Sequence, residues 1–124
     1  MTKTEFRKLL DTVAEAWIAG DARKAADCFA ERVHYGDPTR YSFTSREDLY
    51  KFYAAETNPE RSEWHHVLFD EEAQLGAAEY SYQGTKRYHG LVLIKVTDGQ
   101  ITHWREYQHV SLLDWKEFVG ATLF

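Results

Sequence analysis

The sequence lacks several features that mark particular protein classes. It has one cysteine, Cys28, and two prolines in 124 residues. A lone cysteine excludes an intramolecular disulfide and a cysteine-rich zinc module. The chain also contains no glycine-rich phosphate loop and no serine elbow motif. These absences argue against a disulfide scaffold, a zinc finger, a nucleotide-binding loop and a serine hydrolase.

Long apolar runs and an excess of positive charge are absent too. The run Leu91–Ile94 is far too short to cross a bilayer. The N-terminal segment is interrupted by Arg7, Lys8 and Asp11, which does not fit the core of a signal peptide. The net charge is −5, whereas a nucleic-acid binder presents a basic surface. We therefore expect a cytoplasmic protein that binds neither nucleic acid nor a membrane.

What the sequence does contain is typical of one folded domain over residues 1–124. Hydrophobic residues make up 44% and charged residues 28%, which is an ordinary globular composition. Aromatic residues reach 15%, a load that excludes intrinsic disorder. A chain of this length buries a core without disulfides or metals.

Helical periodicity dominates the first part of the chain. Apolar side chains recur three or four residues apart up to a stop signal at Gly20, and Thr2 with Glu5 forms a capping-box pattern. This pattern predicts a first helix over most of residues 2–20. A short second helix is predicted after Asp21, with Phe29 on its apolar face.

The rest of the chain reads mainly as strands. A short strand is predicted over Glu31–Gly36, and a third helix from Ser45 to a point before Pro59. After that the apolar period changes from 3.6 to 2, which is typical of strands. We predict four further strands and a last helical turn or two, over Ser62–Phe69, Gln74–Tyr82, Lys86–Val96, Gln100–Val110 and Ser111–Phe118. Early helices and a late antiparallel meander indicate an α+β fold, with the helices on one face of a curved sheet.

Alternation along the strands divides their side chains between two faces. The assignment depends on turn lengths, which we take as two residues at Gln83-Gly84 and three at Thr97–Gly99. The first face mixes small, aromatic and acidic residues, which suits a ligand pocket under the helices. Its members are Trp64, His66, Leu68, Ala77, Glu79, Ser81, Tyr88, Gly90, Val92, Trp104, Glu106 and Gln108.

The second face is aromatic and aliphatic, with four histidines and two arginines. Left open to water it would be a large apolar surface, so we expect it to form a homodimer interface. A histidine-rich interface is also expected to loosen below about pH 6. Its members are His65, Val67, Phe69, Ala78, Tyr80, Tyr82, Arg87, His89, Leu91, Leu93, His103, Arg105, Tyr107 and His109.

Segments spread over nearly the whole chain match one family pattern: Ala16-Trp17, Gly20-Asp21, Cys28–Glu31, Tyr35–Pro38, Ser45–Leu49, Tyr88–Gly90, Asp98–Ile101 and Trp104–Tyr107. With these segments the chain resembles the nuclear transport factor 2-like superfamily, in its SnoaL-like and limonene-epoxide-hydrolase-like branch. The resemblance implies a cone-shaped fold, also called a cystatin-like roll, in which a curved, mainly antiparallel sheet encloses a deep pocket. It also implies a homodimer through the convex sheet face. The superfamily includes isomerases such as the ketosteroid type, cyclases, epoxide hydrolases, dehydratases and carriers, so the fold alone does not define an activity.

The resemblance also implies three catalytic candidates. In the limonene-epoxide-hydrolase pattern a catalytic aspartate follows the Trp-Arg pair of the last strand, and the matching position here is Glu106. The tyrosine and asparagine that help to hold the attacking water in that pattern fall on Tyr35 and Asp37. The arginine and second aspartate of the pattern have no clear equivalent, so the full acid–base set of an epoxide hydrolase is not reproduced.

Each candidate also has a structural interpretation. A carboxylate such as Glu106 inside an apolar cone has a raised pKa and suits general acid or base catalysis, or else it is a buried structural partner for a neighbour such as His66 or for a helix N-terminus. Glu79 either shares the pocket with Glu106 or pairs with a cation at the rim. Asp37 and Tyr35 either bind at the pocket mouth or belong to an ordinary turn before a proline. His66, Glu79 and Glu106 together would resemble a metal site, but no local spacing supports one, and we expect neither a metal nor an organic cofactor.

These observations lead to a functional prediction. The expected ligand is a small hydrophobic molecule, and the expected reaction is proton transfer by an isomerase, cyclase or hydrolase with Glu106 as the base. The alternatives are a non-catalytic ligand-binding protein and a protein-interaction module. The residues expected to contact the substrate are Trp64, His66, Glu79, Tyr88, Trp104 and Gln108.

Overall fold

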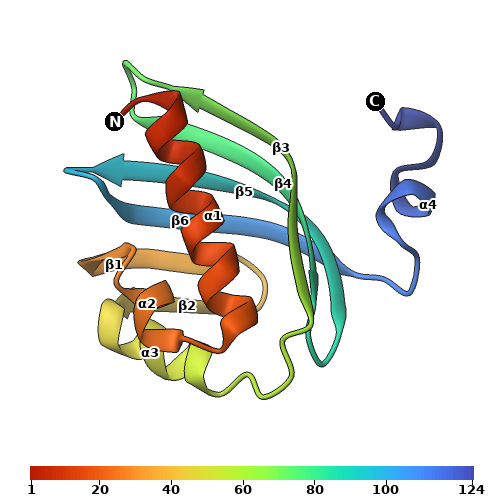
Figure 1. Ribbon diagram of the computed structural model, residues 1–124, viewed down its shortest axis with the longest axis horizontal. Coiled ribbons are helices and arrows are strands. Elements are labelled where there is room, and N and C mark those ends of the chain that lie inside the picture. Colours follow the sequence, from red (N-terminus) through yellow and green to blue (C-terminus); the bar gives the residue numbers. More distant parts are fainter.

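The computed structural model describes residues 1–124 and shows a curved sheet wrapped around one long helix (Figure 1). The helices are α1 (Lys3–Ala19), α2 (Ala22–Ala26), α3 (Arg46–Ala54) and α4 (Trp115–Val119), and a 3-10 turn, η1 (Gly120–Thr122), follows α4. The strands are β1 (Phe29–Asp37), β2 (Tyr41–Ser45), β3 (Arg61–Asp70), β4 (Leu75–Gln83), β5 (Arg87–Thr97) and β6 (Gln100–Val110). The strand order is β2-β1-β6-β5-β4-β3, and only β1 and β6 run parallel. The predicted α+β class and the mainly antiparallel sheet are confirmed.

The ends of α1 follow the predicted capping signals. The Thr2 hydroxyl accepts a hydrogen bond from the Glu5 amide at 3.2 Å, which satisfies one of the free amides of the first turn. At the other end Gly20 adopts a left-handed conformation with φ 72°, which costs glycine little. Between these ends one face of α1, including Phe6 and Leu10, is fully buried.

The core lies between α1 and the concave side of the sheet, as Figure 1 shows. Trp64 of β3 donates its indole N–H to the Leu10 carbonyl of α1 at 3.0 Å, and Phe6 stacks on Phe69 with ring centroids 4.2 Å apart. The short helices α2 and α3 cover the end of the sheet formed by β1 and β2. None of the helices has both the length and the apolar character needed to cross a bilayer.

Two local predictions near β1 need correction. Phe29 does not lie on α2, which ends at Ala26, but begins β1. The strand β2 was not predicted, because its five residues carry a weak alternation between a turn and a helix. It forms a hairpin with β1 in which Gly36 faces Ser42, and a Cβ at Gly36 would lie 2.5 Å from the Tyr41 carbonyl oxygen. The close approach of the two strands therefore depends on a glycine at this position.

The side chains of β6 face the side predicted for them, although the turn before β6 differs from the predicted one. Asp98 and Gly99 form a two-residue turn with φ values of 51° and 77°, the pattern of a type I′ hairpin. Such a turn alone would reverse the face of β6. A bulge in β6 at Thr102, opposite the step from Lys95 to Val96, restores it. Glu106 consequently points to the concave side.

The predicted face of β4 is wrong, because the loop before β5 has three residues instead of two. Gln83 pairs with Arg87, which leaves Gly84, Thr85 and Lys86 in the loop. A change of one residue moves every side chain of a strand to the other face. Tyr80 and Tyr82, with Ala78, therefore lie on the concave side, whereas Ala77, Glu79 and Ser81 lie on the convex side.

The predicted faces of β3 are wrong for His66 and right for Trp64. The second half of the strand pairs with β4 so that His66 faces Glu79, and both residues lie on the convex side, contrary to prediction. A bulge between Trp64 and His66 changes the face once more. Trp64 therefore points inward to the core, as predicted.

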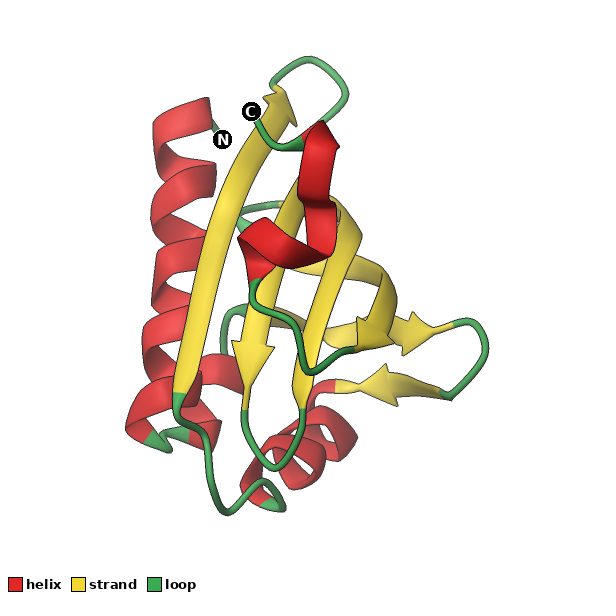
Figure 2. Cartoon of the chain, turned by 90° about the vertical axis from the view of Figure 1, so that its right-hand side faces the viewer, coloured by secondary structure: helices red, strands yellow, loops and turns green.

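The convex face is partly covered by the C-terminal segment. Figures 1 and 2 show α4 on the side of the sheet opposite to α1. Trp115 of α4 stacks on His65 with ring centroids 4.0 Å apart. His65 Nε2 and His89 Nδ1 each lie 2.7 Å from the Ser81 hydroxyl, and His89 Nε2 lies 2.7 Å from the Leu113 carbonyl oxygen. Since a carbonyl only accepts, His89 Nε2 carries a proton and donates it. This relay of contacts, from His65 through Ser81 and His89 to the Leu113 carbonyl, holds the C-terminal segment against the sheet.

Candidate functional site

A cavity of about 410 Å³ opens between the helices and the concave side of the sheet. Its volume is within the range of small-molecule sites. Most of the residues that line it are apolar or aromatic, with few polar groups among them. The lining consists of Ala16, Trp17, Gly20, Ala22, Tyr35, Arg40, Tyr41, Phe52, Tyr53, Ala55, Glu56, Pro59, Tyr80, Tyr82, Tyr88, Glu106 and Gln108.

Glu106 is the buried acid of this cavity, with only 4% of its surface exposed. Tyr41 of β2 donates its hydroxyl to Glu106 Oε1. Tyr80 of β4 and the indole N–H of Trp104 donate to Oε2, at 3.0 and 3.2 Å. Three elements far apart in sequence therefore meet at one carboxylate.

The strand pattern explains why these groups converge. Trp104, Glu106 and Gln108 alternate along β6 and share its concave side. Tyr35 of β1 pairs with Trp104 across the parallel ladder, and their rings are stacked with centroids 5.7 Å apart. The stack fixes the indole of Trp104, whose N–H then points at Glu106.

Burial dominates the electrostatics of the site. It raises the pKa of Glu106, since removal from water disfavours the charged form. The hydrogen bonds from Tyr41, Trp104 and Tyr80 pull this pKa down again, and the charge of Asp37 raises it. Burial also raises the pKa of Tyr80 and of Tyr41, and the Glu106 charge raises both further. Both phenols therefore remain protonated donors at neutral pH.

Gln108 closes a ring of polar groups around the acid. Its amide donates to the Tyr41 oxygen at 3.0 Å, and its carbonyl oxygen lies 2.9 Å from the Tyr80 hydroxyl. Tyr80 carries a single hydroxyl proton, so it donates to Glu106 or to Gln108 at one time. The four side chains Tyr41, Tyr80, Glu106 and Gln108 thus form one connected network.

Five of the predicted site residues come together in or beside this cavity. Glu106, Gln108, Tyr35 and Tyr88 line it, and Trp104 lies directly behind Glu106. Tyr35 is buried, and burial together with the nearby Glu106 charge raises its pKa. Tyr88 lies at the mouth.

A cation lies beside Tyr88 at this mouth. The Arg40 guanidinium donates to the Tyr88 hydroxyl at 3.2 Å and lies 4.9 Å from its ring centre. The bond joins the turn between β1 and β2 to β5. This hydrogen bond fixes the Tyr88 side chain. Arg40 lines the cavity as well.

The remaining predicted site residues lie elsewhere. Trp64 is part of the core behind the cavity. Asp37 accepts hydrogen bonds from the Thr39 amide and hydroxyl at 3.0 and 2.9 Å, so it holds its own turn together. His66 and Glu79 pair with each other at 3.3 Å on the convex face. The predicted contact of these two residues with the pocket is wrong, because the β4–β5 loop is one residue longer than assumed.

Sequence reasoning missed the two phenols that bind Glu106. Tyr41 was missed because β2 was not predicted, and Tyr80 was placed on the outer face by the same loop error. The signal available for Tyr80 was its position opposite Gly90, since a glycine in a strand marks a close approach by a neighbour. Tyr41 follows a Pro-Thr-Arg turn, which is a hairpin signal.

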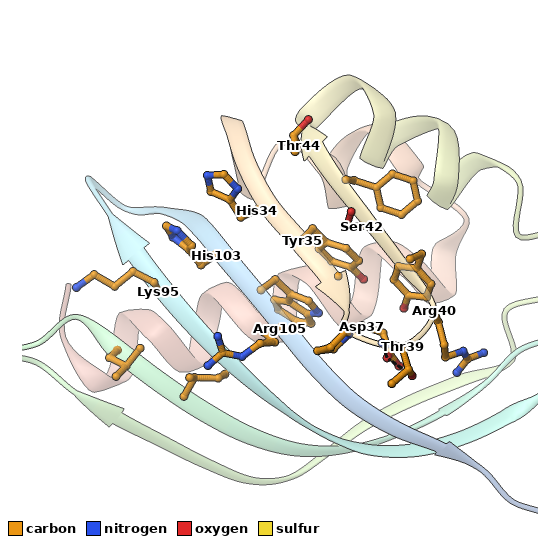
Figure 3. A pocket seen from close by; sticks show the side chains of 17 residues that line it. His34, Tyr35, Asp37, Thr39, Arg40, Ser42, Thr44, Lys95, His103 and Arg105 are labelled. Atoms are coloured by element: carbon orange, nitrogen blue, oxygen red, sulfur yellow. Dashed lines mark hydrogen bonds between the residues drawn. The ribbon is translucent and has the colours of Figure 1, made fainter.

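A second hollow lies on the outer side of the sheet, along β1, β2 and the adjoining strands (Figure 3). It is a groove of about 810 Å³ whose labelled residues include His34, His103, Lys95 and Arg105. His34 and His103 are stacked with ring centroids 4.9 Å apart. The groove is wide and exposed and contains no buried acid–base network, so the enclosed cavity at Glu106 is the better candidate site.

Fold and cavity together define an NTF2-like cone with an internal acidic site. Residues 10–104 match the family model of the SnoaL-like domain, and the chain belongs to this family. No curated protein matches the sequence.

Solved structures share the fold at low sequence identity. An NTF-2 like protein of unknown function from Burkholderia xenovorans LB400 superposes with a TM-score of 0.79 at 16% identity, over 98% of each chain. An LEH-like epoxide hydrolase of M. tuberculosis gives 0.73 at 14%, over 86% of this chain and 84% of that one. A protein with a ketosteroid isomerase-like fold from Catenulispora acidiphila, in complex with trimethylamine, gives 0.69 at 17%, over 80% and 83%. At these identities the likeness establishes the fold.

Proposed function

We propose that the protein is an enzyme that moves a proton on a small hydrophobic molecule, with Glu106 as the group that takes up and returns the proton. One observation carries this proposal. Glu106 is a nearly fully buried carboxylate on the wall of an aromatic cavity, and it is bound by Tyr41 and Tyr80. Burial brings the pKa of such a group toward neutral pH, where a general acid or base works best.

The network around Glu106 accommodates both protonation states. When Glu106 is ionised, Tyr41 and Tyr80 both donate to it. When Glu106 is protonated at Oε2, it donates to Tyr80, and Tyr80 donates to Gln108. Both arrangements use the same heavy-atom contacts, so we expect a proton to be gained and lost without rearrangement of the site.

Several reactions of this superfamily begin with the same step. Isomerisation and aldol-type cyclisation start when a base removes a proton from carbon, and hydrolysis starts when a base removes one from water. The aromatic lining excludes water from a bound hydrophobic substrate and so strengthens the electrostatic effect of Glu106. The family membership and the LEH-like and ketosteroid isomerase-like neighbours support this class of chemistry.

The first experiment is a thermal-shift screen with hydrophobic small molecules, followed by turnover assays on the hits. A ligand that binds the native state raises the melting temperature by mass action. Glu106→Gln retains the size of the side chain and removes its charge, and Glu79→Gln is the matched control on the convex face. We expect the control to turn over a hit like the wild type and Glu106→Gln to lose most of the rate, by about 10²–10⁴-fold for a general base. Equal turnover by Glu106→Gln would remove Glu106 from the mechanism.

A non-catalytic ligand-binding protein is the second candidate. It is favoured by the fact that both oxygens of Glu106 already accept hydrogen bonds inside the protein. A hit that binds tightly and is recovered unchanged, without any exchange of its C–H hydrogens in D₂O, would support this role.

We also propose that two copies associate through the convex face. Large apolar side chains are exposed there, among them Leu68 at 70% and Leu91 at 47%. Burial of such a patch is a common driving force for symmetric dimers. Sedimentation velocity is expected to show a dimer that Leu91→Asp converts to a monomer, while Lys51→Asp on α3 leaves it intact. A wild-type monomer at micromolar concentration would contradict the proposal.

A further inference from the structure

The cavity has one cation at its mouth. Among the residues that line it, Arg40 is the only basic one, whereas Glu56 and Glu106 are acids. Arg40 belongs to the turn between β1 and β2 and directly precedes Tyr41, whose hydroxyl donates to Glu106. Arg40 is exposed and Glu106 is buried. A positive charge therefore lies at the open end of the cavity, and the acid network lies inside it.

Arg40 carries donors that the protein does not use. Its side chain makes one hydrogen bond, from Nη2 to the Tyr88 hydroxyl at 3.2 Å, and no ion pair with an acid. A guanidinium has five N–H donors, and their fork fits the two oxygens of a carboxylate. The contact with the Tyr88 hydroxyl and ring holds the group in place. Most of the donors of Arg40 are therefore free at a fixed position of the mouth.

The other charge at the mouth, Glu56, is engaged within the protein. Its Oε1 accepts hydrogen bonds from the Asn58 amide at 3.0 Å and from the Thr85 hydroxyl at 3.2 Å. Burial and the neighbouring Glu56 carboxylate raise the pKa of Tyr82, so this phenol also stays protonated beside the acid. The carboxylate at the mouth thus has its donors inside the protein, while the cation lacks an acid partner. The charge that the mouth offers to a ligand is positive.

The outer groove adds positive charge on the same side of the mouth. Arg40 lines both hollows, and Lys95 and Arg105 line the groove as well (Figure 3). Neither of these two residues forms an ion pair. The acid of the groove, Asp37, is buried and accepts hydrogen bonds from Thr39. An approaching anion therefore meets positive charge here, although the net charge of the chain is −5.

The interior of the cavity restricts the rest of the ligand. Its walls are mainly apolar and aromatic, and its buried acid is Glu106. A carboxylate placed inside would lose its hydration and would meet a like charge whenever Glu106 is ionised. The apolar part of an amphipathic anion therefore fits the interior, and its charged end fits the mouth.

We propose that Arg40 binds the carboxylate of an amphipathic ligand whose apolar part lies in the cavity beside Glu106. This inference rests on the proposed function and names its substrate class as hydrophobic monocarboxylates. One guanidinium matches one negative charge, whereas a phosphate dianion would keep a second charge without a partner. Arg40 thus selects an acid over a neutral analogue and sets the direction in which the ligand enters.

Two pairs of probes test this site, and each pair compares a carboxylate with its primary amide of nearly the same shape. The aromatic pair is 2-naphthylacetate and 2-naphthylacetamide, and the aliphatic pair is octanoate and octanamide. Calorimetry at pH 7.5 measures the four affinities. We expect the wild type to bind the carboxylate of at least one pair about tenfold more tightly than the amide, as one charge-assisted contact at a partly exposed position provides.

Variants at matched positions locate the preference. Arg40→Gln is expected to bind the carboxylate and the amide about equally, with an unchanged affinity for the amide that shows an intact cavity. Arg40→Lys retains the charge without the fork and is expected to keep only part of the preference. Arg105→Gln removes the same charge from the outer groove, does not alter the cavity lining and is expected to keep the wild-type preference. Glu106→Gln is expected to keep at least that preference, because it removes a negative charge from the interior.

The outcomes decide this inference and the proposed function separately. Equal affinities within both pairs in the wild type, or failure of all four probes to bind, would overturn the anion site. A preference that is kept in Arg40→Gln and lost in Arg105→Gln would place the anion in the outer groove and overturn it as well. An Arg40-dependent preference in a protein that turns over none of its ligands would support the anion site and contradict proton transfer. Glu106-dependent turnover of a neutral compound, without any preference for acids, would do the reverse.

Discussion

Gly90 and Tyr80 face each other across β5 and β4, and the missing side chain of Gly90 sets the position of the Tyr80 hydroxyl. A Cβ at Gly90 would lie 2.8 Å from that hydroxyl oxygen and 2.8 Å from the Tyr107 carbonyl oxygen. The hydroxyl in turn donates to Glu106. A glycine on one strand thus controls a hydrogen bond to the acid on the next strand.

Gly90→Ala is therefore expected to disturb both stability and the site. The new methyl group overpacks a buried contact, which costs about 1–3 kcal/mol of unfolding free energy, and it displaces Tyr80 from Glu106. Urea denaturation measures the loss. A variant as stable as the wild type, with unchanged ligand binding, would show that Tyr80 moves aside freely.

Tyr80→Phe and Tyr41→Phe are expected to raise the pKa of Glu106 above its wild-type value. Each phenol donates to the carboxylate and lowers its pKa, so removal of either donor leaves burial less opposed. NMR titration of the labelled Glu106 carboxyl carbon measures the midpoint. Tyr107 lies next to Glu106 on β6 but on the outer side of the sheet, so Tyr107→Phe is expected to leave the Glu106 pKa unchanged. Identical midpoints in all four proteins would contradict the assigned donor roles.

The raised pKa of Glu106 also predicts how stability depends on pH. In the folded protein Glu106 holds its proton to a higher pH than in the unfolded chain, where the ordinary value is 4.5. The unfolded state binds fewer protons in this interval, so the contribution of Glu106 to stability falls as pH rises from about 4.5 through the folded-state pKa. Each unit by which the pKa is raised corresponds to about 1.4 kcal/mol.

Glu106→Gln isolates this effect, because glutamine does not titrate. The unfolding free energy of the wild type minus that of the variant is expected to decrease between pH 4.5 and pH 8, as measured by urea denaturation. Parallel curves for the two proteins would mean that Glu106 titrates at its ordinary pKa.

Gly76→Ala is expected to destabilise the core. A Cβ at Gly76 would lie 2.3 Å from Cζ of Phe6, and Phe6 is fully buried and stacked on Phe69. The same Cβ would lie 3.0 Å from the backbone carbonyl oxygen of Leu68, so we expect a loss of about 1–3 kcal/mol from overpacking. Ala77→Ser, the next residue on the outer side, is expected to change stability by less than about 0.5 kcal/mol. Thermal unfolding of both variants provides the comparison, and equal midpoints would refute the packing argument.

Acidification is expected to release the C-terminal segment from the convex face. Burial lowers the pKa of His65, so the docked tail disfavours its protonation. The stabilisation from this contact is present above the ordinary histidine pKa of about 6.5 and is lost as pH falls through the lower value of the docked state. Hydrogen exchange of the amides of residues 115–119 is expected to accelerate at pH 5.5 relative to pH 7.5, after correction for intrinsic rates. Ser81→Ala, which breaks the relay, is expected to show fast exchange already at pH 7.5.

The sequence predicted much of the fold because its strong signals are local. The capped helix from Thr2 to Gly20, the late meander and the inward position of Glu106 depend on apolar spacing and on cap residues. The positions of Glu79 and Tyr80 depend on the length of one polar loop, which composition does not define. The bulges next to Trp64 and at Thr102 are likewise set by packing against neighbouring strands and not by local sequence.

The candidate site was predicted only in part for the same reason. Glu106, Gln108 and Trp104 lie on one strand, so a single alternation places all three. The donors Tyr41 and Tyr80 reach Glu106 through the hairpin β1–β2 and the pairing of β4 with β5, which are relationships between distant segments. Asp37 was assigned to the site because its position matches a family pattern. Its side chain instead accepts hydrogen bonds from Thr39 and closes a turn.

The length of the loop Gly84–Lys86 determines which side chains of β4 face the cavity. Deletion of one of its exposed residues would leave every residue of β4 in place in the sequence and yet exchange the set of side chains that the strand presents to the cavity. Tyr80 and Tyr82 would leave the interior, and Glu79 and Ser81 would enter it. One deletion in a surface loop would thus replace the two phenols on the cavity wall by a second carboxylate and an alcohol. No residue that lines the cavity would be substituted.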